Sequence, residues 1–220
     1  MPDLGGIGGS DLFVLEFGDI LHYYTPYTLT LFVLALIFTG LAILARPEGQ
    51  VDIAFGGDAY YAKETAVSEM RFRRFMTIAC GLATMGAMGS GDIFNFTLFA
   101  SLVGITNVGI VAAVKSRHVL DAAYEYGIVA MVATLPLFGG AALILATTGT
   151  LSIPALAAGA SAVPPVGKAL LALGVIGEGM APFYAAKAEM FRAPGAPYVI
   201  MCSLSSLLIF LRVVEIAITI

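Results

Sequence analysis

The chain has 220 residues, of which 59% are hydrophobic and only 12% are charged, and its formal net charge is −4. Soluble domains carry about 25% charged residues, so this composition excludes a water-exposed surface over most of the chain. The acidic balance argues against nucleic acid as a partner, and without a soluble domain a self-contained enzyme is not expected.

Residues 1–26 are predicted to form an extracytoplasmic N-terminal segment. The part from Met1 to Asp19 contains acidic side chains but no Lys or Arg. It therefore lacks the basic region that opens a signal peptide, and we expect it to be retained.

Residues 27–220 are predicted to form an all-α, polytopic membrane helix bundle with about six spans. Crossing a hydrocarbon core of roughly 30 Å takes about 20 mostly apolar helical residues, and the apolar runs here do not alternate as barrel strands would. The expected spans are Tyr27–Ala45, Phe72–Ser90, Ile93–Val114, Tyr126–Thr147, Val166–Ala186 and Ala196–Ile218. The polar segment at 46–71 is expected to be a solvated loop or a short surface helix.

The distribution of Lys and Arg predicts the orientation in the cell membrane. These residues follow spans one, three and five, whereas the connections Gly89–Asp92 and Gly149–Pro165 contain none. Lys168 is the only basic residue near a predicted outer end. Because inner loops are enriched in Lys and Arg, the loop at 46–71 is predicted to be cytoplasmic and both termini to lie outside.

Span five carries the first candidate for an ion path. Glu178 stands between Gly177 and Gly179, four residues before Pro182. Proline cannot donate to the carbonyl of Glu178, so a broken helix is expected there. A charge at mid-membrane costs roughly 2.5–3.5 kcal/mol, which favours a functional role for this carboxyl over simple packing. Lys187, beyond the break, either faces a polar interior or anchors the inner end.

Two further carboxylates lie at span ends. Glu125 stands at the inner mouth of span four, where it is either a relay for the ion or an ordinary solvated charge. Asp92 opens span three, where capping of the helix N-terminus accounts for it, and it is the ion-path candidate on the outer side, either as a structural or as an entry carboxylate. Arg212 and Glu215 in span six are three residues apart on one helix face, which predicts an ion pair within the membrane.

No residue pattern indicates a metal or a cofactor. Cys80 and Cys202 fall in separate apolar runs, and His22 and His118 have no second ligand at metal-binding spacing. Both cysteines are interpreted as packing residues.

Several segments resemble the antiporter-like subunits shared by Mrp antiporters, complex I and energy-converting hydrogenases. Span three and its start read GSGDIFNFTLFASLVGITNVGIVA, similar to the family signature, and TTGTLSIPALA resembles the family turn that follows the next span. The resemblance continues through the proline in span five to Leu211-Arg212-Val213, and it covers about Arg71 to Val214. It implies one of the two helix repeats of such a subunit.

The departures from the family pattern bear on function. The family glutamate falls on Ser101, one family lysine falls on Gly177, and another falls on or beside Leu204. Glu125 stands where the family has a lysine at the start of span four, and Glu178 follows the missing lysine of span five. We therefore expect the chain to assist an ion path more than to constitute one.

A short subunit of this kind resembles the H membrane subunit of the Eha energy-converting nickel–iron hydrogenase of methanogenic archaea. The resemblance implies a non-redox subunit of a complex in which H⁺ or Na⁺ flow drives ferredoxin reduction by hydrogen. The nickel–iron centre and iron–sulfur clusters would then belong to partner subunits. The alternatives are a structural scaffold without an ion path and a subunit of a multisubunit Na⁺/H⁺ antiporter.

Overall fold

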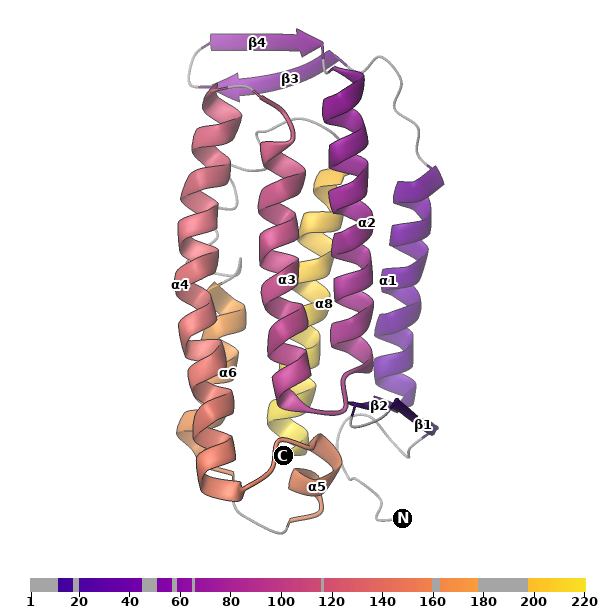
Figure 1. Cartoon of the computed structure of the whole chain (residues 1–220), viewed down its shortest axis with the longest axis vertical. Coiled ribbons are helices and arrows are strands. Elements are labelled where there is room, and N and C mark those ends of the chain that lie inside the picture. The colour runs from indigo at the N-terminus through magenta and orange to yellow at the C-terminus, as the bar shows by residue number, and fades with distance from the viewer. Residues whose placement is uncertain are drawn as a thin grey trace.

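The computed structural model describes residues 12–17, 20–44, 51–56, 59–64, 66–115, 117–159, 163–177 and 198–220. Its helices run side by side in an elongated bundle with a small strand pair near each end (Figure 1). The helices are α1 Pro26–Leu44, α2 Val67–Gly89, α3 Ile93–Ala112, α4 Arg117–Thr148, α5 Ile153–Ala157, α6 Pro165–Gly177 and α8 Tyr198–Thr219.

The predicted membrane helix bundle is confirmed. Within the described residues four helices are long and apolar enough to cross a bilayer, namely Pro26–Leu44, Ile93–Ala112, Val119–Thr148 and Ile200–Thr219. The other two expected spans correspond to α2, whose first turns carry three arginines, and to α6, which is described only as far as Gly177. Six spans therefore stay a prediction, as does the helix break, because Pro182 lies outside the described residues.

Two antiparallel strand pairs accompany the helix bundle. β1 Phe13–Phe17 pairs with β2 Ile20–Tyr24, and β3 Val51–Gly56 pairs with β4 Ala59–Glu64. The second pair occupies the segment where a loop or a surface helix was expected. Aromatic residues on both sides of a two-residue Gly-Asp connection favour a hairpin, and this local signal outweighs the polar composition of the segment.

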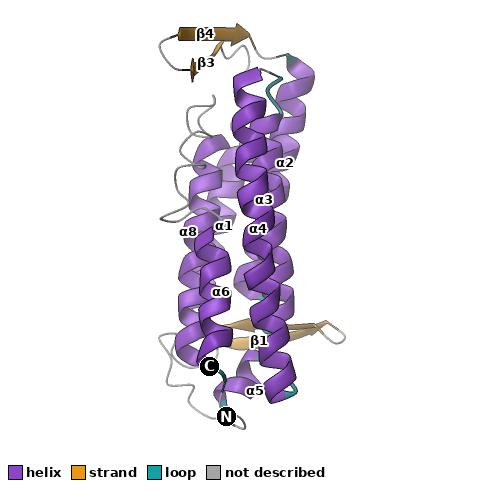
Figure 2. Cartoon of the chain, turned by 90° about the vertical axis from the view of Figure 1, so that its left-hand side faces the viewer, coloured by secondary structure: helices purple, strands orange, loops and turns teal. Residues whose placement is uncertain are grey.

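α1 and α4 lie at opposite sides of the bundle, with α2 and α3 between them and α8 behind (Figure 1). α2 packs against α1, α3 and α8, while α4 packs against α3 and α6. Figure 2, seen from the side of α4, shows that α4 and α6 cover that side of the bundle. The centre of the packed interior contains buried residues of α2, α3 and α8, including Met88, Phe96 and Val213.

Glycines allow the closest helix contacts. A Cβ atom at Gly174 of α6 would lie 2.6 Å from the Cβ atom of Leu137 in α4, and one at Gly140 would lie 2.9 Å from the carbonyl oxygen of Gly167. A Cβ atom at Gly81 of α2 would overlap the side chain of Thr39 in α1. Gly81 therefore allows α1 and α2 to approach each other closely.

The end of the bundle opposite the start of α2 is tied together by backbone hydrogen bonds. The amide of Ile93 donates to the carbonyl of Leu151 and the amide of Ile153 donates to the carbonyl of Gly91, both at 2.9 Å. Asp92 and Ser152 face each other in an isolated antiparallel bridge. The GSGD and TGTLS segments, which are far apart in sequence, therefore lie side by side.

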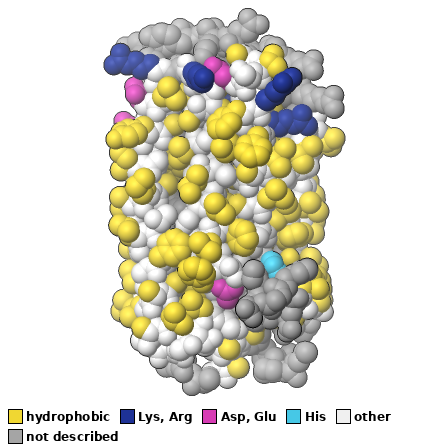
Figure 3. Space-filling view, viewed as in Figure 1, with side chains coloured by type: hydrophobic (Ala, Val, Ile, Leu, Met, Phe, Trp, Pro, Cys, Tyr) yellow, Lys and Arg dark blue, Asp and Glu magenta, His cyan; other side chains and the backbone are white. Residues whose placement is uncertain are grey.

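Basic side chains gather at the other end, which we call the basic end. It is the end where α2 and α4 begin, and Figure 3 shows Lys and Arg there above a wall of hydrophobic side chains. The described residues that contribute are Arg71, Arg74, Lys115 and Arg117. This arrangement is typical of a membrane protein, and the cytoplasmic assignment of the basic end stays a prediction.

Candidate functional site

A stripe of polar side chains on α2 faces the interior of the bundle. Arg73, Thr77, Cys80 and Thr84 follow one another at helical spacing on one face, and all four are buried. On the opposite face of α2, apolar residues such as Phe75 and Leu82 are exposed. Lipid favours this inversion, because polar groups find partners inside the bundle and not in hydrocarbon. We call these four residues the α2 stripe.

Arg73 begins the stripe near the basic end and joins three helices. Its side chain is only 1% exposed, and its Nε donates to the carbonyl oxygen of Ile110 in α3 at 3.2 Å. The guanidinium carbon also stands 5.8 Å from the ring centroid of Tyr198 at the start of α8. Such a cation–π contact stabilises a buried guanidinium group. Arg73 is therefore packed inside the bundle, whereas a basic residue that only flanks a loop would be exposed.

Asn107 of α3 meets the stripe near its middle. Its Oδ1 accepts from the thiol of Cys80 at 3.3 Å, while its Nδ2 is buried without a hydrogen-bond partner among the described residues. The hydroxyls of Thr77 and Thr84 donate to carbonyls of their own helix, at 2.9 and 2.8 Å. A buried unsatisfied amide costs about 1–3 kcal/mol, so Asn107 lowers the stability of the bundle at this level.

Arg212 and Glu215 form a buried ion pair on α8 at the opposite end. Nη2 of Arg212 donates to the carbonyl oxygen of Ser90 at 2.7 Å, just beyond the C-terminus of α2. A cation there compensates the negative end of the helix dipole and the free carbonyls of the last turn. The pair therefore links α8 to the turn between α2 and α3.

Asp92 caps the N-terminus of α3. Its Oδ1 accepts from the amide of Asn95 at 2.7 Å, and its Oδ2 accepts from the side-chain amide of the same residue. The carboxylate is partly buried where the GSGD and TGTLS segments meet. Helix capping thus accounts for both carboxylate oxygens.

Replacing Asp92 with alanine is expected to lower the free energy of unfolding by about 1 kcal/mol, because the cap is lost. Asp92→Asn keeps an oxygen that accepts the Asn95 amide and should remain close to the wild type. Thermal unfolding of the purified chain in detergent measures both. If the asparagine variant were destabilised as much as the alanine variant, the negative charge would matter more than the cap.

The remaining candidates from the sequence are not brought together with these groups. Glu125 is exposed on α4, on the flank of the bundle, and does not join the α2 stripe. Gly177 is buried at the end of α6, where a Cβ atom would lie 2.9 Å from that of Ala133. The described residues do not include Glu178, Gly179, Pro182 and Lys187.

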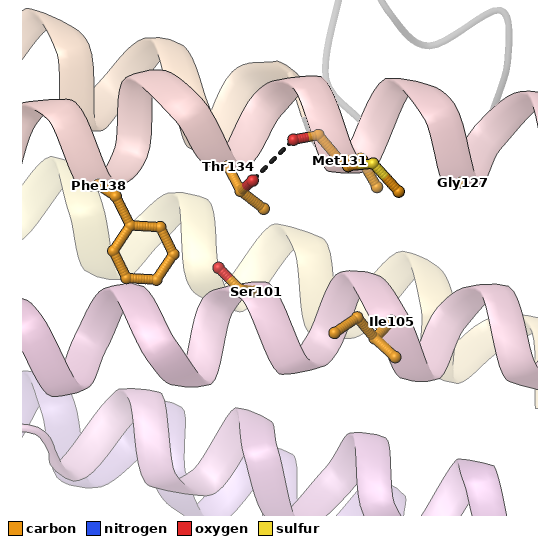
Figure 4. Close-up of a pocket in the computed structure, with 7 residues that line it drawn as sticks. Ser101, Ile105, Gly127, Met131, Thr134 and Phe138 are labelled. Atoms are coloured by element: carbon orange, nitrogen blue, oxygen red, sulfur yellow. Dashed lines mark hydrogen bonds between the residues drawn. The ribbon is translucent and has the colours of Figure 1, made fainter.

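Ser101, the position of the family glutamate, lines a groove and not the α2 stripe. The groove lies between α3 and α4 and has a volume of about 320 Å³. Figure 4 shows Ser101 and Ile105 of α3 opposite Met131, Thr134 and Phe138 of α4. Both hydroxyls in it donate to carbonyls of their own helices, so the groove presents an almost apolar lining.

Among the described residues, no group of three or more His, Cys, Asp or Glu side chains could hold a metal ion. The sequence interpretation missed the interior position of Arg73, which it treated as a charge flanking the inner loop. The available signal was the spacing of Arg73 with Thr77, Cys80 and Thr84, which places a cation on a helix face shared with three small polar residues.

These features define a helical integral membrane protein with ionisable residues inside the bundle. The chain matches the family described as NADH dehydrogenase I, subunit N related protein, over residues 4–220, and it belongs to that family.

Two relatives come from Methanocaldococcus jannaschii. The uncharacterized protein MJ0522 is 49% identical over 214 residues, which cover 94% of this chain and 95% of the relative. The uncharacterized protein MJ1309 is 29% identical over 161 residues, which cover 70% of this chain but only 34% of the relative. The first relative therefore has nearly the same extent as this chain, while the second is much longer.

A chain of the membrane-bound sulfane sulfur reductase, an archaeal respiratory membrane complex, has a similar fold. The TM-score is 0.54 at 21% sequence identity, and the match covers 79% of this chain and 44% of that chain. Likeness at this identity concerns the fold alone. Family and fold together support the expected class, an antiporter-like membrane subunit of the respiratory type.

Proposed function

We propose that this chain is a non-redox membrane subunit of an energy-converting hydrogenase complex. In this proposal it supports the translocation of H⁺ or Na⁺ that is coupled to ferredoxin reduction by hydrogen. The observation that carries the proposal is the family match over residues 4–220, which relates the chain to the ion-translocating membrane arm of respiratory enzymes. The fold, which is similar to that of a chain in a respiratory membrane complex, supports it.

The structure favours an assisting role over a complete ion path. Ser101 lies in an almost apolar groove, and Gly177 is packed against α4, so neither position of the family pattern offers an ionisable group. The buried ionisable residues that are described, Arg73, Arg212 and Glu215, lie elsewhere on α2 and α8. Glu178 is then our candidate for the ion carrier or gate, with Glu125 and Lys187 as relay groups on the inner side and Asp92 as a structural carboxylate.

The redox chemistry belongs to partner subunits in this proposal. A nickel–iron centre and iron–sulfur clusters need cysteine thiolates, and the two cysteines of this chain are both buried and lie on different helices. Mass-spectrometric identification of the subunits that co-purify with the native chain tests the assignment. Nickel–iron hydrogenase subunits are the expected finding, whereas small membrane subunits alone would indicate a Na⁺/H⁺ antiporter.

Replacing Glu178 with glutamine in the intact complex should lower ion-driven ferredoxin reduction several-fold, because the amide does not bind and release a proton. Glu125→Gln, at the proposed relay group that is exposed on the flank of α4, should have a smaller effect. Coupling is measured in sealed vesicles with an imposed ion gradient, and assembly is checked on native gels. Unchanged coupling in a normally assembled Glu178→Gln complex would contradict the carrier role.

A scaffold without an ion path is the second candidate. It is favoured by the local hydrogen bonding of the α2 stripe, because Thr77 and Thr84 donate to their own helix. It is also favoured by the mutual pairing of Arg212 and Glu215. The scaffold reading predicts that Glu125→Gln and Glu178→Gln together change only assembly, which native gels would show as lost neighbouring subunits.

A further inference from the structure

The chain itself covers little of α4, in which 33% of the apolar stretch is buried, against 50% in α3 and 56% in α8, and it covers less still of α1, at 28%. α4 has 32 residues, packs mainly against α3 and α6 among the described helices, and lies on the side of the bundle opposite α1 (Figures 1 and 2). Met131 on its outer side is 71% exposed and Leu135 is similarly exposed. Lipid contact alone explains such exposure.

Two grooves flank the same turns of α4. The groove toward α3 has a volume of about 320 Å³, and a second groove of about 270 Å³ lies toward α6. Small residues line both, including Gly127 and Ala130 in the first and Ala133 in the second. In membranes, small residues at a helix surface allow a second helix to approach closely. The middle of α4 therefore forms a ridge between two hollows, a shape that side chains of another helix can fit.

Gly139 has no packing role within the described chain. A Cβ atom placed on it would meet no atom within 4 Å, whereas its neighbour Gly140 lies against α6. Open space beside a helical glycine leaves room for another backbone to approach closely. Gly139 follows the grooved turns on the same helix, which extends the surface suited to close approach.

Pro136 leaves a backbone carbonyl of α4 without its usual donor, and hydrocarbon offers no donor to replace it. It lies inside α4 and has no N–H, so it cannot donate to the carbonyl oxygen of Val132 one turn earlier. Val132 and Pro136 both line the groove toward α6. Freed carbonyls in membrane helices are commonly satisfied by polar side chains or by water. A lipid acyl chain has no donor, whereas a protein helix can bring one.

Two carboxylates lie on this side of α4, near the basic end. Asp121 and Glu125 are exposed and four residues apart, so they lie on neighbouring turns. Neither has an ion-pair partner within the described part of the chain. Like charges at this spacing destabilise a helix by about 0.2–0.5 kcal/mol. A cation from outside the chain would relieve that repulsion.

We infer that this side of α4, the α4 docking face, binds a transmembrane helix of another subunit that carries Lys or Arg at the level of Asp121 and Glu125. Membrane helices commonly have Lys or Arg at their inner ends, so the two carboxylates complement a parallel or antiparallel neighbour at the predicted cytoplasmic level. The inference rests on the proposed function in one respect, that the chain works within a multisubunit membrane complex.

Photo-crosslinking in native membranes tests the docking face. A benzoylphenylalanine residue is placed at Met131 on α4 or at Leu36 on α1, which is 50% exposed. We expect Met131 to crosslink to an apolar segment of a different subunit with Lys or Arg at one end, and Leu36 to give lipid adducts. The crosslinked peptides are sequenced by mass spectrometry.

Substitutions at the two carboxylates and at Gly139 test whether these residues are needed for the crosslink. Asp121→Asn combined with Glu125→Gln should lower the crosslink yield at Met131 several-fold, and Gly139→Leu should do the same. Gly40→Leu on α1 is the matched control, because a Cβ atom at Gly40 also meets no atom within 4 Å. It should leave the yield unchanged.

Three outcomes would overturn the inference: only lipid adducts at Met131, a crosslink to a second copy of this chain, or a yield that none of the α4 variants changes. The same preparation separates this result from the proposed function. If hydrogenase subunits co-purify and Met131 finds only lipid, the docking face is wrong and the function stands. If the crosslink forms but no redox subunit co-purifies, the proposed function is contradicted.

Discussion

Arg212→Met is expected to destabilise the chain by about 3–5 kcal/mol, because the carboxylate of Glu215 would remain buried without its cation. The carbonyl oxygen of Ser90 would also lose the donor that now lies 2.7 Å away. The loss should appear as a lower unfolding midpoint of the purified chain in detergent.

A matched double variant separates the ion pair from packing. Arg212→Met with Glu215→Leu removes both charges from the buried site, and it should recover most of the lost stability, as expected for a buried pair replaced by apolar side chains. Equal destabilisation of the single and double variants would show that the shape of Arg212, and not its charge, holds α8 against the α2–α3 turn.

Gly174→Ala is expected to lower the free energy of unfolding by about 1–3 kcal/mol, the usual cost of overpacking a close contact. The added methyl carbon would lie 2.6 Å from Cβ and 2.9 Å from Cα and the backbone nitrogen of Leu137. Backbone atoms cannot rotate away, so α6 has to move off α4. Unfolding of the purified chain in detergent measures the cost.

Gly139→Ala is the control for this change. It adds the same methyl group to the same helix pair, but no atom lies within 4 Å of it. The variant should be as stable as the wild type or gain up to about 1 kcal/mol from helix propensity. Similar losses for Gly139→Ala and Gly174→Ala would show that the cost does not come from the close α4–α6 contact at Gly174.

Much of the helix content could be predicted because apolar length alone specifies a membrane helix. α1, α3 and α8 lie close to the predicted ranges. α4 begins at Arg117 and not at Tyr126, because its first turns carry charged side chains that resemble a loop in composition. The strand pairs were missed because their signal lies in side-chain pattern and turn length, which hydrophobicity does not report.

The candidate site was predictable only where its contacts are local. The spacing of Arg212 and Glu215 places them on adjoining turns, so their pairing follows from helix geometry. The contacts of Arg73 with Tyr198 and of Cys80 with Asn107 join separate helices. Such contacts depend on how each helix is rotated about its axis, which one sequence does not specify.

The pairing of the GSGD and TGTLS segments has a consequence for the order of assembly. The carbonyl of Gly91 and the amide of Ile93 bond to Ile153 and Leu151, which are synthesised only after all of α4. We therefore expect the turn between α2 and α3 to lack these hydrogen bonds during synthesis, until α5 has been made and has packed against it. A nascent chain arrested before Leu151 should show a protease-sensitive site at this tip, and one arrested after α5 should not.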